Sequence, residues 1–198
     1  MRKVLSIIGV FGLLLFVAAS AQAAVEYSVT YMGNFTPTAI NNKGDVAGWT
    51  ISADTTVYHV ALWQHAQLQD LGTLAGTYAI PHSINDSDQI VGVSESADGP
   101  LHAFLYDNGE MKDLGAFGGV SGSAYGINNS GQIAANYDTA DGKTHAILYD
   151  HGAITELGSL GGTVTVAKAI NSSGVIAGQG VTSQGERHSL VYNAGRPC

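Results

Sequence analysis

The sequence predicts an all-β protein, a four-bladed β-propeller built from four-stranded repeats of about 43 residues. Two markers recur at this period, a His that precedes an apolar run and an Ile-Asn pair. The His stands at His59, His102, His145 and His188, and the pair at Ile40-Asn41, Ile84-Asn85, Ile127-Asn128 and Ile170-Asn171. A fixed period of this size is typical of stacked supersecondary units, so the repeat defines the architecture.

Each repeat has the pattern of an antiparallel meander. In the third repeat, strands are expected at residues 123–127, 132–137, 144–149 and 153–157. The turn Asn128-Asn129-Ser130-Gly131 separates the first two, and Asp150-His151-Gly152 is a tight hairpin turn between the last two. A Gly-rich connection, Ser159–Thr163, then leads to the next repeat. Three short connections and one long one are typical of a propeller blade.

The terminal strands suggest how the ring closes. Fourth strands are expected at Gln67–Gly72, Glu110–Gly115 and Ala153–Gly158, but no such segment follows Tyr192 in the last repeat. Ser28–Gly33 fits the missing pattern. We therefore expect this N-terminal strand to complete the last blade, because a propeller with an open edge is prone to aggregation. An open β-solenoid, or a fragment of a longer array, is the alternative.

Residues 1–23 have the features of a secretory signal peptide. Arg2 and Lys3 precede an apolar run from Val4 to Ala18, and Ala21-Gln22-Ala23 gives a small-x-small cleavage pattern. An uncleaved membrane anchor is the alternative, but the run is short for a membrane span. The mature chain, residues 24–198, is expected to be one soluble β-propeller domain, secreted or located in the periplasm or outside the cell.

Charge and cysteine content exclude several classes of function. Without Arg2 and Lys3 the chain has six basic residues against 16 acidic ones, a balance unsuited to nucleic acid or anionic lipid. The single cysteine, Cys198, permits no intramolecular disulfide and no Cys-based metal site. A monomer is expected, although Cys198 could link two chains.

The repeat resembles a known family. His102-Ala103-Phe104-Leu105-Tyr106, then Asp113-Leu114-Gly115, then Gly118-Gly119, then Ile127-Asn128-Asn129-Ser130-Gly131-Gln132-Ile133 is similar to the HAF family of bacterial extracellular repeats. The match runs from about Phe35 to Tyr192, and it is weakest in the first and last repeats. The resemblance implies a secreted or surface repeat protein, and it brings no established activity or catalytic residues.

The phased histidines do not predict a metal cage. They begin the third strand of each repeat, and equivalent positions on different blades lie too far apart to share one ion. We expect them to pack within the blades and to hydrogen-bond to backbone. The pairs Asp86/Asp88 and Asp138/Asp141 lack the spacing and ligand count of a calcium loop. No metal or cofactor is therefore predicted.

Positions that differ between repeats are free to contact a ligand. Two residues before the recurring Ile, the four copies have Thr38, His82, Tyr125 and Lys168. The loops between strands two and three also differ, and the last of them, Ser183–Arg187, ends at Arg187. These five residues are the predicted binding site, at the mouth where the loops meet. Neutral drift at tolerant positions is the alternative.

These observations favour a non-catalytic binding or interaction module at the cell exterior, whose ligand is an extracellular glycan or protein. The chain contains no Gly-x-Ser-x-Gly elbow, phosphate loop or zincin helix, and no catalytic residue is predicted. The alternative is an exported hydrolase or lyase acting on polysaccharide, which rests only on the range of activities that propellers carry.

The signal peptide gives the first testable prediction. Protein recovered outside the cytoplasm is expected to begin at Ala24, because cleavage follows the small residue Ala23. Intact-mass measurement checks the N-terminus. Recovery of the uncut chain from membranes would contradict the prediction.

Overall fold

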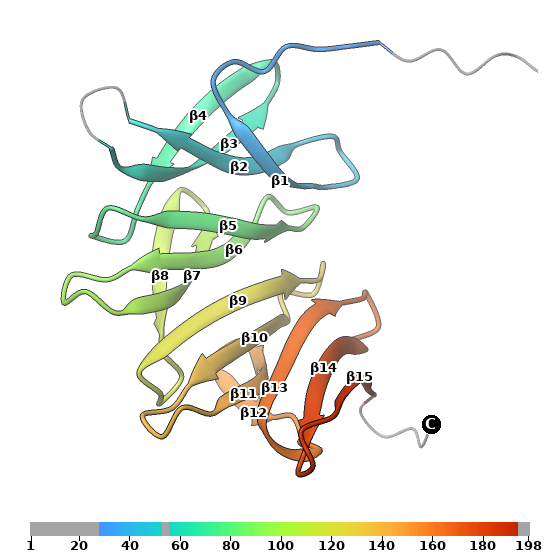
Figure 1. The fold of residues 1–198 in the computed structure, drawn as a ribbon. Coiled ribbons are helices and arrows are strands. Elements are labelled where there is room, and N and C mark those ends of the chain that lie inside the picture. Colours follow the sequence, from blue (N-terminus) through green and yellow to red (C-terminus); the bar gives the residue numbers. More distant parts are fainter. Residues whose placement is uncertain (1–27, 53–55, 194–198) are drawn as a thin grey trace, which may run out of the picture. The chain divides into compact units, whose positions relative to one another are not determined.

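The computed structural model describes residues 28–52 and 56–193, and these residues form an all-β structure (Figure 1). The predicted signal peptide and Cys198 lie outside the described residues. Among the described residues, those from Met32 onward belong to one compact unit, and residues 28–31 belong to another. No helix in the described part of the chain is long and apolar enough to cross a membrane.

The strands form four successive antiparallel meanders, which we call the first to the fourth sheet, although a bridge joins the last two into one seven-stranded sheet. The first contains β1 (Thr36–Ile40), β2 (Val46–Ile51), β3 (Tyr58–Gln64) and β4 (Gln67–Gly72). The second contains β5 (Ala79–Ile84), β6 (Ile90–Glu95), β7 (Leu101–Asp107) and β8 (Glu110–Gly115). The third contains β9 (Ser121–Ile127), β10 (Ile133–Asp138), β11 (Thr144–Asp150) and β12 (Ala153–Glu156), and the fourth contains β13 (Gly161–Ile170), β14 (Ile176–Thr182) and β15 (Arg187–Tyr192).

These bounds confirm the predicted meander. In the third sheet each observed strand begins and ends within two residues of the expected positions. The third and fourth sheets are also joined by one parallel bridge, between Thr144 of β11 and Val164 of β13. One repeat therefore corresponds to one sheet, as the sequence period predicts.

The core lies between successive sheets. Leu62 of the first sheet packs in one cluster with Ile90 and Phe104 of the second, and Val91 of the second packs with Ile147 of the third. A third cluster joins Ala134 and Ala146 of the third sheet to Ala167 and Ile176 of the fourth. Phe104 is completely buried, and burial of such a side chain contributes about 2–3 kcal/mol. Each sheet is therefore held mainly by its neighbours in sequence.

The recurring Asn organises the turn that follows each innermost strand. The Oδ1 atom of Asn85 accepts hydrogen bonds from the backbone N–H groups of Ser87 and Gln89, both at 3.0 Å. Asn41, Asn128 and Asn171 make the same pair of bonds in their own turns. The side chain thus replaces the hydrogen-bond partners that the backbone lacks where the strand ends.

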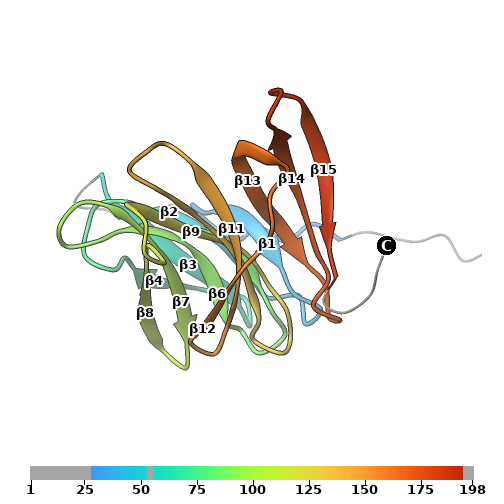
Figure 2. The same ribbon diagram turned by 90° about the horizontal axis from the view of Figure 1, so that it is seen from below.

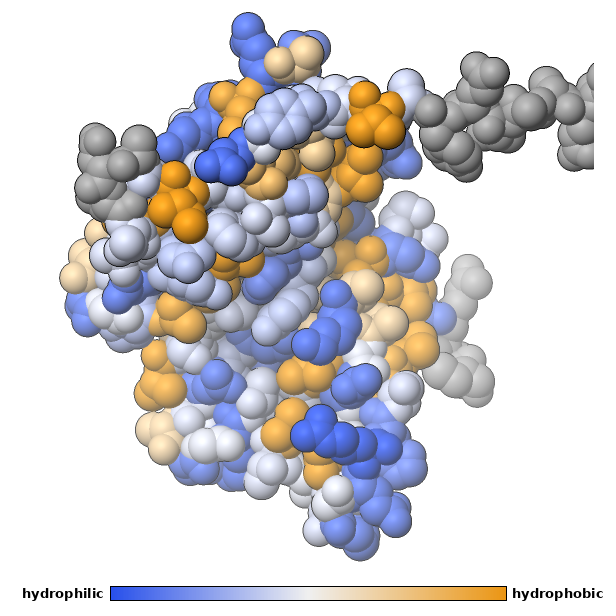
Figure 3. Space-filling view, turned by 45° about the horizontal axis from the view of Figure 1, so that its top comes forward, coloured by the Kyte–Doolittle hydropathy of each residue, from blue (hydrophilic) through white to orange (hydrophobic). Residues whose placement is uncertain are grey.

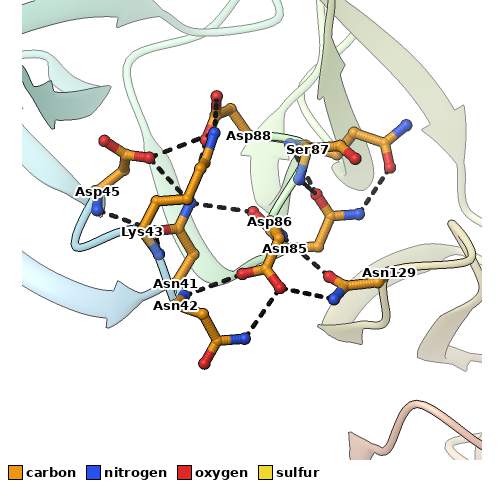
Figure 4. A network of polar contacts seen from close by, with 10 residues as sticks. Asn41, Asn42, Lys43, Asp45, Asn85, Asp86, Ser87, Asp88 and Asn129 are labelled. Carbon is orange, nitrogen blue, oxygen red and sulfur yellow. Dashed lines mark hydrogen bonds and ion pairs between the residues drawn. The ribbon is translucent and has the colours of Figure 1, made fainter.

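The same Asn links neighbouring sheets. Its Nδ2 atom donates to the backbone oxygen of the next Asn along the chain, from Asn41 to Asn85 at 3.2 Å, from Asn85 to Asn128 at 3.0 Å and from Asn128 to Asn171 at 3.1 Å. We call this series of bonds the asparagine ladder, and Figure 4 shows its first members. Since Asn41, Asn85 and Asn128 are buried, these bonds form away from water, where an unpaired amide is costly.

Closure of the ring by the N-terminal strand is not confirmed by the described residues. Residues 28–33 have no strand conformation, and Val29 is 99% exposed. Within the described residues, β15 ends its sheet with no fourth strand beside it.

The asparagine ladder gives a second prediction. Asn85→Ala is expected to lower the free energy of unfolding by about 1–2 kcal/mol more than Asn171→Ala, because it also leaves buried groups unpaired. Asn171 is the matched control, since it makes the same turn bonds but is exposed and donates to no further Asn in the described residues. Urea denaturation measures both. Equal losses would contradict a linking role for the ladder.

Candidate functional site

Four of the five predicted site residues occupy the same structural position. Each innermost strand has a β-bulge, and the extra residue at that bulge is Thr38 in β1, His82 in β5, Tyr125 in β9 and Lys168 in β13. A bulge residue has no partner opposite it, so its side chain is re-aimed relative to the regular strand. We call these four residues the bulge row.

Three members of the bulge row are in contact. The rings of His82 and Tyr125 stack with centroids 4.7 Å apart and an interplanar angle of 11°. The Nζ atom of Lys168 lies 4.5 Å from the centroid of the Tyr125 ring, a cation–π geometry. Thr38 instead donates to the backbone oxygen of Ala47 in its own sheet, at 3.3 Å. The comparison of repeats therefore identified side chains from three sheets that meet in space.

His82 is held in one tautomer. Its Nδ1 atom lies 2.8 Å from the backbone oxygen of Ala124, and because a carbonyl only accepts, Nδ1 carries the proton. Burial lowers the pKa of His82, the bond to Ala124 opposes this by favouring the charged form, and the charge of Lys168 lowers the pKa further. His82 is therefore a neutral stacking partner at pH 7.

A hollow of about 230 Å³ begins at Tyr125. We call it the Tyr125 hollow, and it is lined by Ser121, Gly122, Ser123, Tyr125, Asn136, Asp138, Thr144 and Val166. Both oxygens of Asp138 accept from hydroxyl groups, Oδ2 from Ser121 at 2.8 Å and Oδ1 from Thr144 at 2.7 Å. The hollow thus combines hydroxyl groups, a carboxylate and one aromatic ring.

Asn136 forms the inner wall of the hollow. This residue is 5% exposed, and its amide makes two hydrogen bonds with Ala167, donating to the backbone oxygen at 3.0 Å and accepting from the backbone N–H at 2.7 Å. Asn136 was missed in the sequence. The corresponding positions in the other sheets have Trp49, Val93 and Gln179, so the same comparison of repeats could have found it.

A second hollow of about 230 Å³ lies where the four innermost strands end, lined by the Ile-Asn corners of all four repeats. Its polar rim is internally bonded. Asp86 accepts from the backbone and side chain of Asn42 and from the side chain of Asn129 (Figure 4). Hydrogen bonds from Asn42 lower the pKa of Asp86 most, so its carboxyl group is ionised. The polar groups at the rim of this second hollow therefore already have hydrogen-bond partners in one another.

Two expectations differ from the structure. Arg187 is exposed on β15, and β14 separates that strand from the bulge row in β13, so Arg187 does not join the site. Three of the four phased histidines bond to carboxylates of strand four instead of backbone, His59 to Asp70 at 2.8 Å, His102 to Asp113 at 2.9 Å and His145 to Glu156 at 3.4 Å. The reason is the pleat, which places these side chains on the same face of adjacent strands.

Side chains that could bind a metal ion do not cluster in the described part of the chain. No group of three or more His, Cys, Asp or Glu residues there has the spacing to hold an ion. Asp88, one of the acids considered for a calcium loop, accepts from Lys43 at 2.6 Å and from Asn41 at 3.0 Å.

Comparisons with known proteins identify the fold and no family. No family model and no curated protein sequence matches the chain. Among solved structures, TolB from Acinetobacter baumannii matches with a TM-score of 0.60 and 16% identity, over 79% of this chain and 40% of TolB. A fucose lectin from Kordia zhangzhouensis, solved with methyl-fucoside, matches with a TM-score of 0.39 and 13% identity, over 60% and 94% of the two chains. The TolB match shows a shared β-propeller type of fold, and this chain covers less than half of that protein.

Burial of His82 gives a third prediction. Because its pKa lies below the usual value of about 6.5, the unfolded chain binds the proton more readily than the folded one. The contribution of His82 to stability is present above that pH and is lost as the pH falls through about 6.5 towards the folded pKa. Relative to wild type, His82→Phe is expected to become more stable as the pH falls from about 7 to 5. Urea denaturation across this pH range measures the free energy of unfolding of both proteins. If the two free energies changed in parallel with pH, the prediction would be contradicted.

Proposed function

We propose that this protein is an exported, non-catalytic binding module of the HAF-repeat type, and that it holds a polyhydroxylated ligand, a glycan, in the Tyr125 hollow. The observation that carries the proposal is the juxtaposition of an aromatic ring, hydroxyl groups and a carboxylate in one hollow of about 230 Å³. Few convergent polar groups around an aromatic surface are the usual composition of a small-ligand site.

The chemistry of the lining supports a sugar. Ser121, Ser123 and Thr144 provide hydroxyl groups that both donate and accept, and the carboxylate of Asp138 accepts from sugar hydroxyls. Tyr125 offers its ring edge to the C–H groups of a pyranose, while its faces are in contact with His82 and Lys168. Stacking with His82 and contact with Lys168 fix the orientation of that ring before a ligand arrives, which lowers the entropic cost of binding.

The polar arrangement favours binding over turnover. Asp138 is the single carboxylate among the residues that line the Tyr125 hollow, whereas glycoside hydrolysis ordinarily uses two carboxylates on opposite sides of the bond. Each oxygen of Asp138 accepts from one hydroxyl group of the protein and can accept one more from a ligand, which suits an acceptor that orients a sugar. We therefore assign Asp138 the role of orienting the ligand. Asn136 holds the inner wall of the hollow in place.

The fourth prediction tests this site. The mature protein is screened on a glycan array, and the best ligand is titrated by calorimetry. Tyr125→Ala is expected to weaken binding about five- to thirtyfold, because loss of one aromatic contact costs about 1–2 kcal/mol. Arg187→Ala is the matched control, since Arg187 lies outside the hollow, and it should leave the affinity unchanged.

Two outcomes would contradict the proposal. Binding that survives the combined Tyr125→Ala and Lys168→Ala variant would remove the Tyr125 hollow as the site. Turnover of a polysaccharide that Asp138→Asn abolishes would replace the binding module with the exported hydrolase or lyase.

A further inference from the structure

The first and the last sheet each leave one face uncovered. In the internal sheets the same face is buried against a neighbouring sheet. Ile84 and Ile127 are 7% and 6% exposed at the boundaries between sheets, but Ile40, at the same position in the first sheet, is 68% exposed. On the opposite face, Leu62 of the first sheet is 2% exposed, while its counterpart in the last sheet, Val191, is 58% exposed. Each uncovered face therefore exposes an apolar residue at a position that is buried where a neighbouring sheet covers it.

The last sheet also has an unpaired edge. In the first three sheets the third strand pairs with a fourth, as β3 does with β4. Figure 2 shows β15 (red) at the outside of its sheet, and no strand pairs with its outer edge in the described residues. An exposed row of backbone N–H and C=O groups is a template for another strand.

Ser28–Gly33 has the sequence and part of the geometry of a fourth strand. Gly33-Asn34-Phe35 corresponds to Gly72-Thr73-Leu74 and to Gly115-Ala116-Phe117, with a Gly followed two residues later by a large apolar residue. Gly33 has a φ of 84°, close to the 77° of Gly72 and the 74° of Gly115. Tyr31, which precedes this corner, is 87% exposed. The corner after the expected strand is thus preformed, while residues 28–33 have no strand conformation.

The asparagine ladder is likewise unfinished at its end. In the first three repeats the Nδ2 atom of the Asn donates to the next Asn, and also to the side chain four residues ahead, such as Gln89. In the last repeat the residue four positions ahead is Val175, and Asn171 Nδ2 has no acceptor among the described residues. A further Asn backbone oxygen, such as that of Asn41, would continue the series.

We propose that two copies of this chain associate head to tail. The last sheet of each copy packs against the first sheet of the other, and Ser28–Gly33 of the other copy pairs with the free edge of β15. One contact then satisfies all three unpaired features: the faces of Ile40 and Val191, the edge of β15, and the ladder at Asn171.

A second copy fits better than the chain's own first sheet. The three internal interfaces are already formed, with Phe104, Ile147 and Ala167 fully buried, and together they still leave Ile40 and Val191 exposed. Closure of one chain on itself would require those packed interfaces to shift, and close-packed cores resist such changes. Association of two copies leaves the three interfaces within each chain unchanged. They give a ring of eight sheets, within the range that propellers form, and a heterologous contact that closes leaves no open end.

The repeat also fixes the register of the added strand. In the first sheet Leu62 of β3 faces Gln69 of β4. The same position in the last sheet pairs Val191 with Thr30 of the other copy. His188, whose counterparts His59 and His102 bond to Asp70 and Asp113, would then face Tyr31, a hydroxyl group in place of the carboxylate.

Figure 3 shows apolar residues (orange) reaching the surface in separate groups on the face it displays.

The fifth prediction is a cross-link between copies. In a Cys198→Ser background of the mature chain, Thr30→Cys and Val191→Cys variants are purified separately, mixed and oxidised. Directly opposite strand residues lie within disulfide distance, so a disulfide-linked heterodimer is expected on a non-reducing gel. Light scattering on the unmodified protein in reductant should give twice the mass of one mature chain.

Matched variants separate register from chance contact. Arg187→Cys replaces Val191→Cys as the control, since it lies four residues away on β15, about 13 Å along the strand, and should not cross-link to Thr30→Cys. Val191→Glu should return the protein to one copy, whereas Ile154→Glu, at an apolar side chain that is 50% exposed on β12, should not. Circular dichroism confirms that both remain folded.

Three results would overturn the proposal. The first is a monomeric mass with a cross-link only within the chain when Thr30→Cys and Val191→Cys are combined, which would mean closure by its own N-terminal strand. The second is a monomeric mass with no cross-link in any combination. The third is open-ended polymers, which would exclude the two-copy ring.

Discussion

The hydrogen bond from each recurring Asn to the next is the interaction on which the arrangement of the sheets depends. It acts at the ends of the innermost strands, where the chain reverses and the backbone would otherwise leave polar groups unpaired. One side chain holds its own turn through Oδ1 and binds the neighbouring sheet through Nδ2. The apolar clusters supply the free energy of burial, but the Asn sets which backbone atoms meet, so it fixes the spacing at which the clusters can pack.

The candidate site follows from this arrangement. With the innermost strands held at a constant spacing, equivalent bulges in successive strands come into line, and side chains 43 residues apart in sequence come into contact. A repeat that needs His, Tyr or Lys at this position for its own folding would keep one residue type there. Different residues at one bulge show that the fold does not dictate the side chain there, because the bulge itself is present in all four strands.

The terminal sheets show the cost of building a protein from repeats. Each sheet buries its apolar face against a neighbour, so the first and the last necessarily present interface residues to solvent unless they are capped. The ring of Phe35 partly covers the outer face of the first sheet. It lies so close to Gly48 that a Cβ atom at that position would be 2.6 Å from the ring. The last sheet has Ala177, Ser189 and Val191 exposed on its outer face and an unpaired edge at β15. This asymmetry is what makes a directional, head-to-tail contact the natural completion.

The sequence by itself determined the repeat, the four-stranded meander and the turn at each Asn, because these depend on local conformation and on a pattern that recurs every 43 residues. It also singled out His82, Tyr125 and Lys168, since differences within a repeat mark positions that the fold does not dictate. Only the tertiary structure decided that these side chains stack, that Arg187 lies apart, that Asn136 lines the Tyr125 hollow and that His59 and His102 bond to carboxylates. Pairing between distant segments depends on register and curvature, and these are set by the sum of all the interfaces between sheets and not by any one stretch of sequence.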